Sequence, residues 1–181
     1  MYTKEQLKRL LIPLMFEQVL TALMGSVDTI MVTNIGSAAI SAVSLVDSLN
    51  ILIINVFAAM ATGGAIICAQ YLGSNQKDRA NQALKQLIFS VTLISILITI
   101  PCIVFRRPLL TLIFGSVEKS VMDNSLSYLY ITALSYPFIA LYNAAAASFR
   151  TSQNSRLPMA IAFGSNILNI LGNTFFIFTL N

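Results

Sequence analysis

The sequence predicts an all-α membrane protein, a polytopic bundle of about five transmembrane helices. Hydrophobic residues make up 56% and charged residues only 10% of the 181-residue chain, against roughly 45–50% and about 25% in typical soluble domains. The apolar residues form long stretches, and about 20 residues of helix suffice to cross a hydrocarbon core about 30 Å thick. The charged residues lie mainly between these stretches. A water-soluble fold is therefore not expected.

Five apolar stretches are long enough to be membrane-spanning helices. The second is longer than the membrane requires, so it is expected to tilt or to extend into water. Pro137 lies inside the fourth and is expected to kink it, since proline removes a backbone hydrogen bond. The segment 73–83 and the segment around Gly115 are expected to be polar loops. The predicted spans are residues 10–33, 38–72, 84–105, 125–148 and 157–180.

The basic residues predict the orientation, because short cytoplasmic loops are enriched in Lys and Arg. With the amino terminus inside, eight basic residues fall on the cytoplasmic side and three on the outside. The amino terminus is therefore predicted to be cytoplasmic and, after five crossings, residue 181 to be external. The inside set is Lys4, Lys8, Arg9, Lys77, Arg79, Lys85, Arg150 and Arg156, and the outside set is Arg106, Arg107 and Lys119.

Several function classes find no support in the sequence. The basic residues are scattered between apolar stretches, so membrane lipid and not nucleic acid is the expected partner. Cys68 and Cys102 lie far apart in apolar stretches and the chain has no His, so we interpret both as packing residues and not as zinc ligands. No phosphate-binding loop or catalytic triad is visible, and neither an enzyme activity nor a cofactor is predicted.

Three carboxylates lie inside predicted spans, where a charged side chain costs at least about 2.5–3.5 kcal/mol and usually faces a cavity or a partner. Asp28 is the strongest functional candidate, since it lies deep in the first span between Gly25 and Met31. Glu17 lies eleven residues earlier, on the same helical face about 16 Å away; alternatively, it contacts interfacial water. Asp47, at a comparable depth in the second span, either faces one cavity with Asp28 or is hydrogen-bonded to a neighbouring Ser or Asn.

The fifth predicted span carries three amides, Asn166, Asn169 and Asn173. Their spacing of three and four residues places them along one helical stripe. Two interpretations stay open. The amides either hydrogen-bond a neighbouring helix, a contact worth about 0.6 kcal/mol on average in membranes, or line a polar cavity.

Short sequence motifs are spread over nearly the whole chain. They are Ile12 with Pro13, VDTIM at 27–31, GSAAISAVS at 36–44, AQYLG at 69–73, AAASFRTSQNSRLPM at 145–159 and LNILGN at 168–173. In their order and spacing they resemble the multidrug and toxic compound extrusion (MATE) transporters, which are cation-coupled efflux pumps.

This resemblance implies a fold of twelve helices in two six-helix lobes. It implies an antiporter in the plasma membrane, the inner membrane of a bacterium, that exports small amphiphilic, often cationic drugs by alternating access against inward flow of sodium or protons. It further implies that Asp28, Asn169 and Asn173 line a cation-responsive cavity of the amino-terminal lobe, where sodium binds transiently at Asp28. Asn143 matches a cavity residue of the fourth helix.

The chain departs from the family in two respects. Some members have an acid at the position of Asn173. The amide here removes a titratable partner of Asp28, which counts against proton coupling through a carboxylate pair. It remains a good oxygen ligand for a hard cation such as sodium, so sodium and protons both stay open as the coupling ion. Five spans also do not complete one lobe. Residues 1–181 are therefore expected to be an incomplete amino-terminal lobe that does not transport without the rest of its lobe and the second lobe.

Two other functions fit a membrane protein of this kind. A flippase for lipid-linked precursors, from the wider superfamily with the same two-lobe plan, is expected to line its cavity with several Arg residues, and no Arg lies inside a predicted span. A non-transporting membrane scaffold would assemble through faces of small residues. The alignment of Asp28, Asn169 and Asn173 argues against the scaffold, which needs no polar cavity.

Overall fold

The computed structural model of the protein describes residues 4–32, 36–152 and 156–175. Throughout these ranges the regular structure is helical, which confirms the predicted all-α fold class. Long helices occupy the positions of all five predicted spans. The helices are α1 (Lys4–Val32), α2 (Ser37–Gly73), α3 (Lys77–Val104), α4 (Arg106–Phe114), α5 (Lys119–Thr151) and α6 (Arg156–Thr174).

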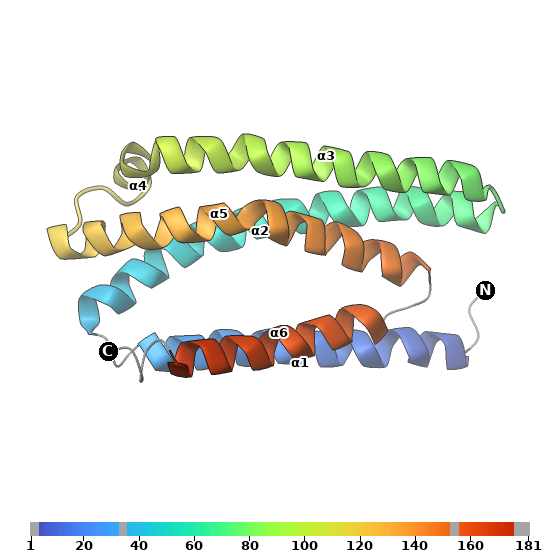
Figure 1. Ribbon diagram of the computed structural model, residues 1–181, viewed down its shortest axis with the longest axis horizontal. Coiled ribbons are helices and arrows are strands. Elements are labelled where there is room, and N and C mark those ends of the chain that lie inside the picture. Colours follow the sequence, from blue (N-terminus) through green and yellow to red (C-terminus); the bar gives the residue numbers. More distant parts are fainter. Residues whose placement is uncertain (1–3, 33–35, 153–155, 176–181) are drawn as a thin grey trace. The chain divides into compact units, whose positions relative to one another are not determined.

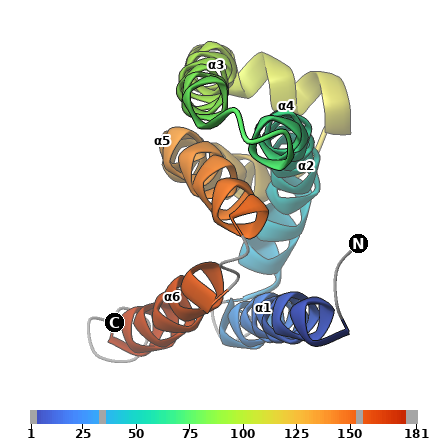
Figure 2. The same ribbon diagram turned by 90° about the vertical axis from the view of Figure 1, so that its right-hand side faces the viewer.

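The helices belong to two compact units, each described by itself. Unit 1 consists of residues 1–36 and 152–181 and contains α1 and α6, whereas unit 2 consists of residues 37–151 and contains α2 to α5. In unit 1, α1 packs on α6 and the two helices run in the same direction (Figure 1). In unit 2, α2 and α3 form an antiparallel pair, and α5 packs against both of them (Figure 2).

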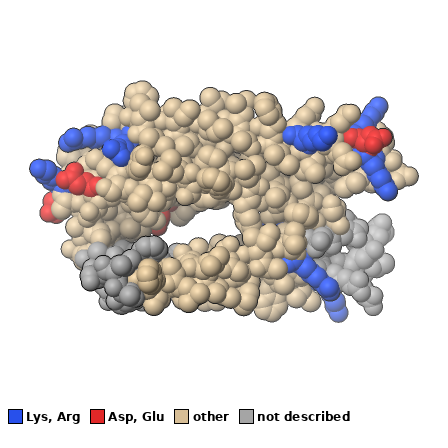
Figure 3. Space-filling view, viewed as in Figure 1, with Lys and Arg blue, Asp and Glu red and all other residues tan. Residues whose placement is uncertain are grey.

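Three of the described helices, α2, α3 and α5, are long and apolar enough to cross a membrane. Large apolar side chains cover their outer surfaces, as shown by Phe89 and Phe138, which are 68% and 73% exposed. Lys and Arg side chains gather at the two ends of unit 2 (Figure 3). This arrangement is that of a lipid-facing bundle. In α1 the apolar part is Leu11–Gly25, and for α1 and α6 the spanning role stays a prediction.

The helices begin earlier than the sequence predicted. α1 begins at Lys4 and not at residue 10, α3 at Lys77 and not at 84, and α5 at Lys119 and not at 125. Most of the predicted 73–83 loop is therefore helix. The added residues are largely charged or amide-bearing side chains, which favour helix well enough but lower the hydropathy by which spans were recognised. A span predicted from hydropathy thus marks the apolar part of a helix and misses its polar extension.

A further correction concerns α4, whose residues were predicted to be part of a loop. Its nine residues are too few to cross a membrane. Phe105 separates it from α3, where the Phe105 amide donates to the Pro101 carbonyl at 2.8 Å. Leu110 of α4 is 1% exposed, so the helix is held by burying this side chain in the core of unit 2.

The connection between α2 and α3 is a tight turn. The Asn75 amide donates to the Leu72 carbonyl at 3.1 Å and the Gln76 amide to the Tyr71 carbonyl at 2.9 Å. Asn75 has a φ of 59°, and Asn is one of the few residues that adopt this left-handed conformation readily. This hydrogen-bond pattern is the Schellman motif. It ends α2 and lets α3 begin at once in the opposite direction.

Small residues bring α2 and α3 close together. A Cβ atom added to Gly64 of α2 would overlap the buried side chain of Leu87 on α3, whereas one added to the adjacent Gly63 would meet nothing within 4 Å. Small residues commonly permit such an approach between helices in membranes. Gly64 therefore sets the spacing of the α2–α3 pair.

Gly64→Leu should destabilise the protein and Gly63→Leu should not. The first change forces Leu87 out of its position and should cost about 1–3 kcal/mol, the usual range for overpacking. The matched change at Gly63 adds the same side chain on an open face. Thermal unfolding of both purified variants in detergent measures the difference, and equal midpoints would show that Gly64 does not set the helix spacing.

Candidate functional site

The candidate residues of the first and last helices all belong to unit 1. Because α1 and α6 pack together and run in the same direction (Figure 1), their carboxyl-terminal ends lie at the same end of the unit. Asp28 is near the end of α1, and Asn169 and Asn173 are near the end of α6. Asn169 is half-buried. The side chains of Asp28 and Asn173 lie outside the described part of the structure.

Glu17 is buried in α1, with 5% of its surface exposed. Its backbone carbonyl accepts a hydrogen bond from the Thr21 hydroxyl at 2.9 Å. Contact with interfacial water was one interpretation of this residue, and its burial does not support that interpretation. A buried carboxylate in a predicted membrane span remains a candidate for function by the general rule for such residues.

Asn166 uses its amide within its own helix. The side chain is 8% exposed, and its Nδ2 donates to the backbone carbonyl of Ala162 at 2.8 Å. Asn143 does the same in α5, where its Nδ2 donates to the carbonyl of Ile139 at 2.9 Å. Each amide therefore satisfies a donor locally, and its side-chain oxygen is the group that it can offer to a ligand.

Asp47 is the centre of a hydrogen-bonded network in unit 2. Its Oδ1 accepts from the Tyr128 hydroxyl at 3.1 Å and from Asn50 Nδ2 at 3.2 Å. The Asn50 Oδ1 in turn accepts from the Tyr136 hydroxyl at 2.7 Å. One of the two predictions for Asp47, a hydrogen bond to a neighbouring Asn, is thereby confirmed. The other, a cavity shared with Asp28, stays a prediction.

The network joins α2 to α5 through groups that are mostly buried. Asn50 is 8% and Tyr136 1% exposed, while Asp47 and Tyr128 are half-buried. The ring of Tyr136 meets that of Phe57 edge to face, with centroids 6.2 Å apart. A carboxylate held by two donors keeps a fixed orientation, so the network positions Asp47 on α2.

Asn50, Tyr128 and Tyr136 were not singled out from the sequence. Asn50 follows Asp47 by three residues and Tyr136 follows Tyr128 by eight, so each pair shares one helical face. A Tyr hydroxyl in an apolar helix needs a hydrogen-bond partner. The need of the Tyr hydroxyls for partners, together with polar residues that share one face on each helix, was the signal that could have predicted the pairing of α2 with α5. Asn143 lies seven residues beyond Tyr136, about 10 Å along α5, and does not join the network.

Cys68 and Cys102 are both buried, on α2 and α3 respectively, and neither is in a disulfide. Cys102 belongs to the apolar core of unit 2. This location supports their interpretation as packing residues.

Comparison with known proteins identifies relatives over nearly the whole chain. The MatE family model matches residues 13–175. A curated relative, the uncharacterized transporter YisQ of Bacillus subtilis (strain 168), is 30% identical over 168 residues, which are 93% of this chain and 36% of the relative. The chain therefore spans little more than a third of the length of the curated relative that it matches.

Solved structures show the same fold. A MATE protein in complex with MaD3S superposes with a TM-score of 0.92 at 21% identity, over 98% of this chain and 40% of that protein. An outward-facing multidrug resistance MATE transporter of the MOP superfamily gives 0.91 at 21% identity, over 98% and 39%. A MOP superfamily transporter from Pyrococcus furiosus, described as having a binding pocket of reversed polarity, gives the same values.

Proposed function

This chain belongs to the MatE family of membrane transporters, and from that premise we propose that it is the amino-terminal part of a cation-coupled antiporter that exports amphiphilic, often cationic compounds. The complete protein would be in the plasma membrane, with the amino terminus of this chain in the cytoplasm. Sodium or protons flowing inward would drive the export. This activity needs binding of the ion and of the exported compound and a conformational change of the protein, and it includes no chemical step.

One observation carries the proposal. α1 and α6 are a parallel, packed pair (Figure 1), and each brings polar residues into the same end of that pair, Asp28 from one and Asn169 and Asn173 from the other. Acids and amides in membrane-spanning helices typically mark ion and substrate pathways. One carboxylate and two amide oxygens would together make a suitable ligand set for a hard cation such as sodium.

Coupling follows if the ion and the exported compound favour different states of the protein. Sodium or a proton at Asp28 would stabilise one of two orientations of the helices, and the compound would stabilise the other. Each can shift the equilibrium only by its difference in affinity for the two states. Asp28 is the group whose charge changes with ion occupancy, so it is the proposed coupling residue.

Two experiments test the proposal. The coding sequence beyond Asn181 should contain a sixth helix and a second lobe, and a stop codon there would contradict the assignment to an amino-terminal part. Expressed in bacteria that lack their own efflux pumps, the longer gene should raise resistance to lipophilic cationic dyes and residues 1–181 alone should not. Equal resistance from both genes, or from neither, would contradict the proposal.

A further inference from the structure

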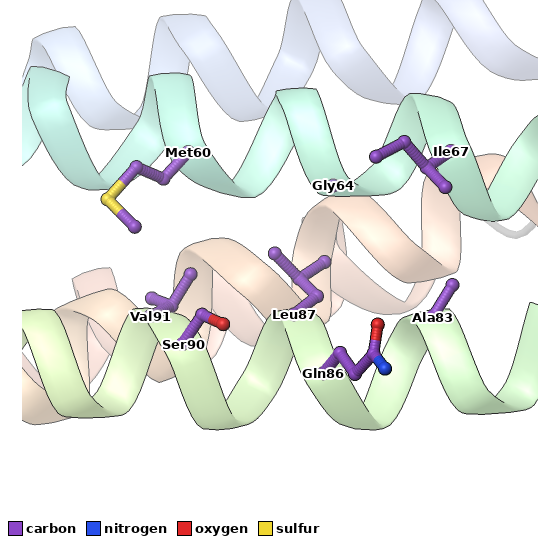
Figure 4. A pocket seen from close by; sticks show the side chains of 8 residues that line it. All are labelled: Met60, Gly64, Ile67, Ala83, Gln86, Leu87, Ser90 and Val91. Atoms are coloured by element: carbon purple, nitrogen blue, oxygen red, sulfur yellow. The ribbon is translucent and has the colours of Figure 1, made fainter.

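A groove runs between α2 and α3 in unit 2. Met60, Gly64 and Ile67 line it from α2, and Ala83 and Leu87 face them from α3 (Figure 4). Its volume is about 320 Å³. Most of the lining is hydrocarbon, and its length from 83 to 91 corresponds to about 12 Å of helix. The groove therefore suits a slender apolar ligand lying along the helices.

Polarity increases along α3 toward its amino-terminal end. Gln86 and Ser90 are the polar residues of the groove, and Gln86 extends from α3 toward α2 (Figure 4). Arg79 precedes Ala83 by four residues and Gln86 by seven, so all three follow one helical stripe. The stripe leads from the groove directly to a cationic side chain.

The amino-terminal end of α3 is basic. Lys77, Arg79 and Lys85 are exposed there, with Asp78 as the acid among them, which leaves a formal charge of +2 from three cations and one anion. Figure 3 shows blue side chains, with red among them, at one end of unit 2. A second hollow of about 550 Å³, lined by residues from Asn75 to Arg79, lies at the same turn. The charge and this polar hollow suit an anionic head group.

The distances match one leaflet of a bilayer. Along a helix rising about 1.5 Å per residue, the groove from Ala83 to Val91 lies about 9–21 Å from Lys77. Half of a hydrocarbon core about 30 Å thick is about 15 Å. A lipid whose phosphate is near Arg79 would therefore lay its acyl chain along the groove.

We propose that the α2–α3 groove is a binding site for an anionic phospholipid, with an acyl chain lying along Met60, Ile67 and Ala83 and the phosphate held by Lys77 and Arg79. Each cation near a membrane surface contributes about 1 kcal/mol of attraction to anionic lipid, a factor of about five. The site is separate from Asp28 and does not depend on the proposed transport activity.

Native mass spectrometry of the purified chain in detergent tests the head-group preference. The protein should retain dioleoyl phosphatidylglycerol in preference to dioleoyl phosphatidylcholine, and Lys77→Gln with Arg79→Gln should reduce that preference about 25-fold. The matched control is Arg107→Gln with Lys119→Gln at the opposite end of unit 2, which should leave it unchanged. Equal retention of both lipids, or loss of the preference only in the control, would overturn the proposal.

Photo-crosslinking in lipid nanodiscs tests the position of the acyl chain. Phosphatidylglycerol with a diazirine in its acyl chain should label residues 60–67 and 83–91, and Ala83→Leu, or Ser90→Leu if the first variant does not fold, should reduce this labelling severalfold. Labelling spread evenly over all apolar faces would overturn the site. So would a crosslinked dimer through these residues, since a second copy of the chain would then occupy the groove.

Discussion

In the full-length protein proposed to contain this chain, Asp28→Asn should abolish the dependence of efflux on the ion gradient. The amide keeps the size of the side chain and removes its charge, so a bound cation loses its counter-charge. Coupling between two sites typically changes affinity about 5–150-fold. The factor by which a sodium or proton gradient speeds up efflux should therefore fall by a similar amount in the variant. Dye efflux from everted membrane vesicles, measured with and without each gradient, gives this ratio directly.

A matched variant separates coupling from general damage. Asp123→Asn makes the same substitution at an exposed position near the start of α5, and its gradient dependence should equal that of the unmodified protein. Protein levels in the vesicles must match, so that rates can be compared. Efflux by Asp28→Asn that responds to the gradient as before would contradict the coupling role of Asp28.

The second large effect is expected at Asn50, the residue that links Asp47 to Tyr136. Asn50→Leu removes a donor from Asp47 Oδ1, at 3.2 Å, and an acceptor from the Tyr136 hydroxyl, at 2.7 Å. Asp47 Oδ1 keeps its hydrogen bond from Tyr128, so the buried Tyr136 hydroxyl is the group that loses its partner. Such a group costs about 1–3 kcal/mol, and we expect a loss of that size in stability. Unfolding of the purified protein by a denaturing detergent measures it.

A double-mutant cycle assigns this loss to the network. Tyr136→Phe removes the hydroxyl that donates to Asn50. In that background the Asn50–Tyr136 hydrogen bond is already absent, so Asn50→Leu removes one hydrogen bond fewer. The double variant should therefore be more stable than the sum of the two single losses predicts, by about 0.5–1.5 kcal/mol. Strict additivity would show that the two side chains do not act together.

The sequence predicted the helices well where apolar residues run long enough, because the cost of leaving backbone groups unpaired in a membrane forces such stretches to be helical. The sequence did not predict α4, because its nine residues are too few to span a bilayer and so do not form a hydrophobic stretch of spanning length. It also failed at the polar beginnings of α3 and α5. Lys77 and Lys119 start these helices, but hydropathy alone assigns such residues to loops.

The candidate site was predictable in part. Asp47 was recognised from the cost of a charge inside a span, and its partner Asn50 is close enough in sequence to have been expected. Tyr128 and Tyr136 lie more than 80 residues further along the chain. Which helix pairs with which depends on tertiary packing, and a single sequence does not encode that in any local pattern. The pairing of α1 with α6 is a contact of the same long-range kind.

The tight turn at Asn75 has a mechanical consequence. Two backbone hydrogen bonds close the turn, and Gly64 packs directly against Leu87. The α2–α3 hairpin is therefore rigid at its connection. A force that tilts α2 must tilt α3 with it, as one stiff lever about 40 Å long at 1.5 Å per residue over some 28 residues. Rocking movements are therefore transmitted along this hairpin and not absorbed within it.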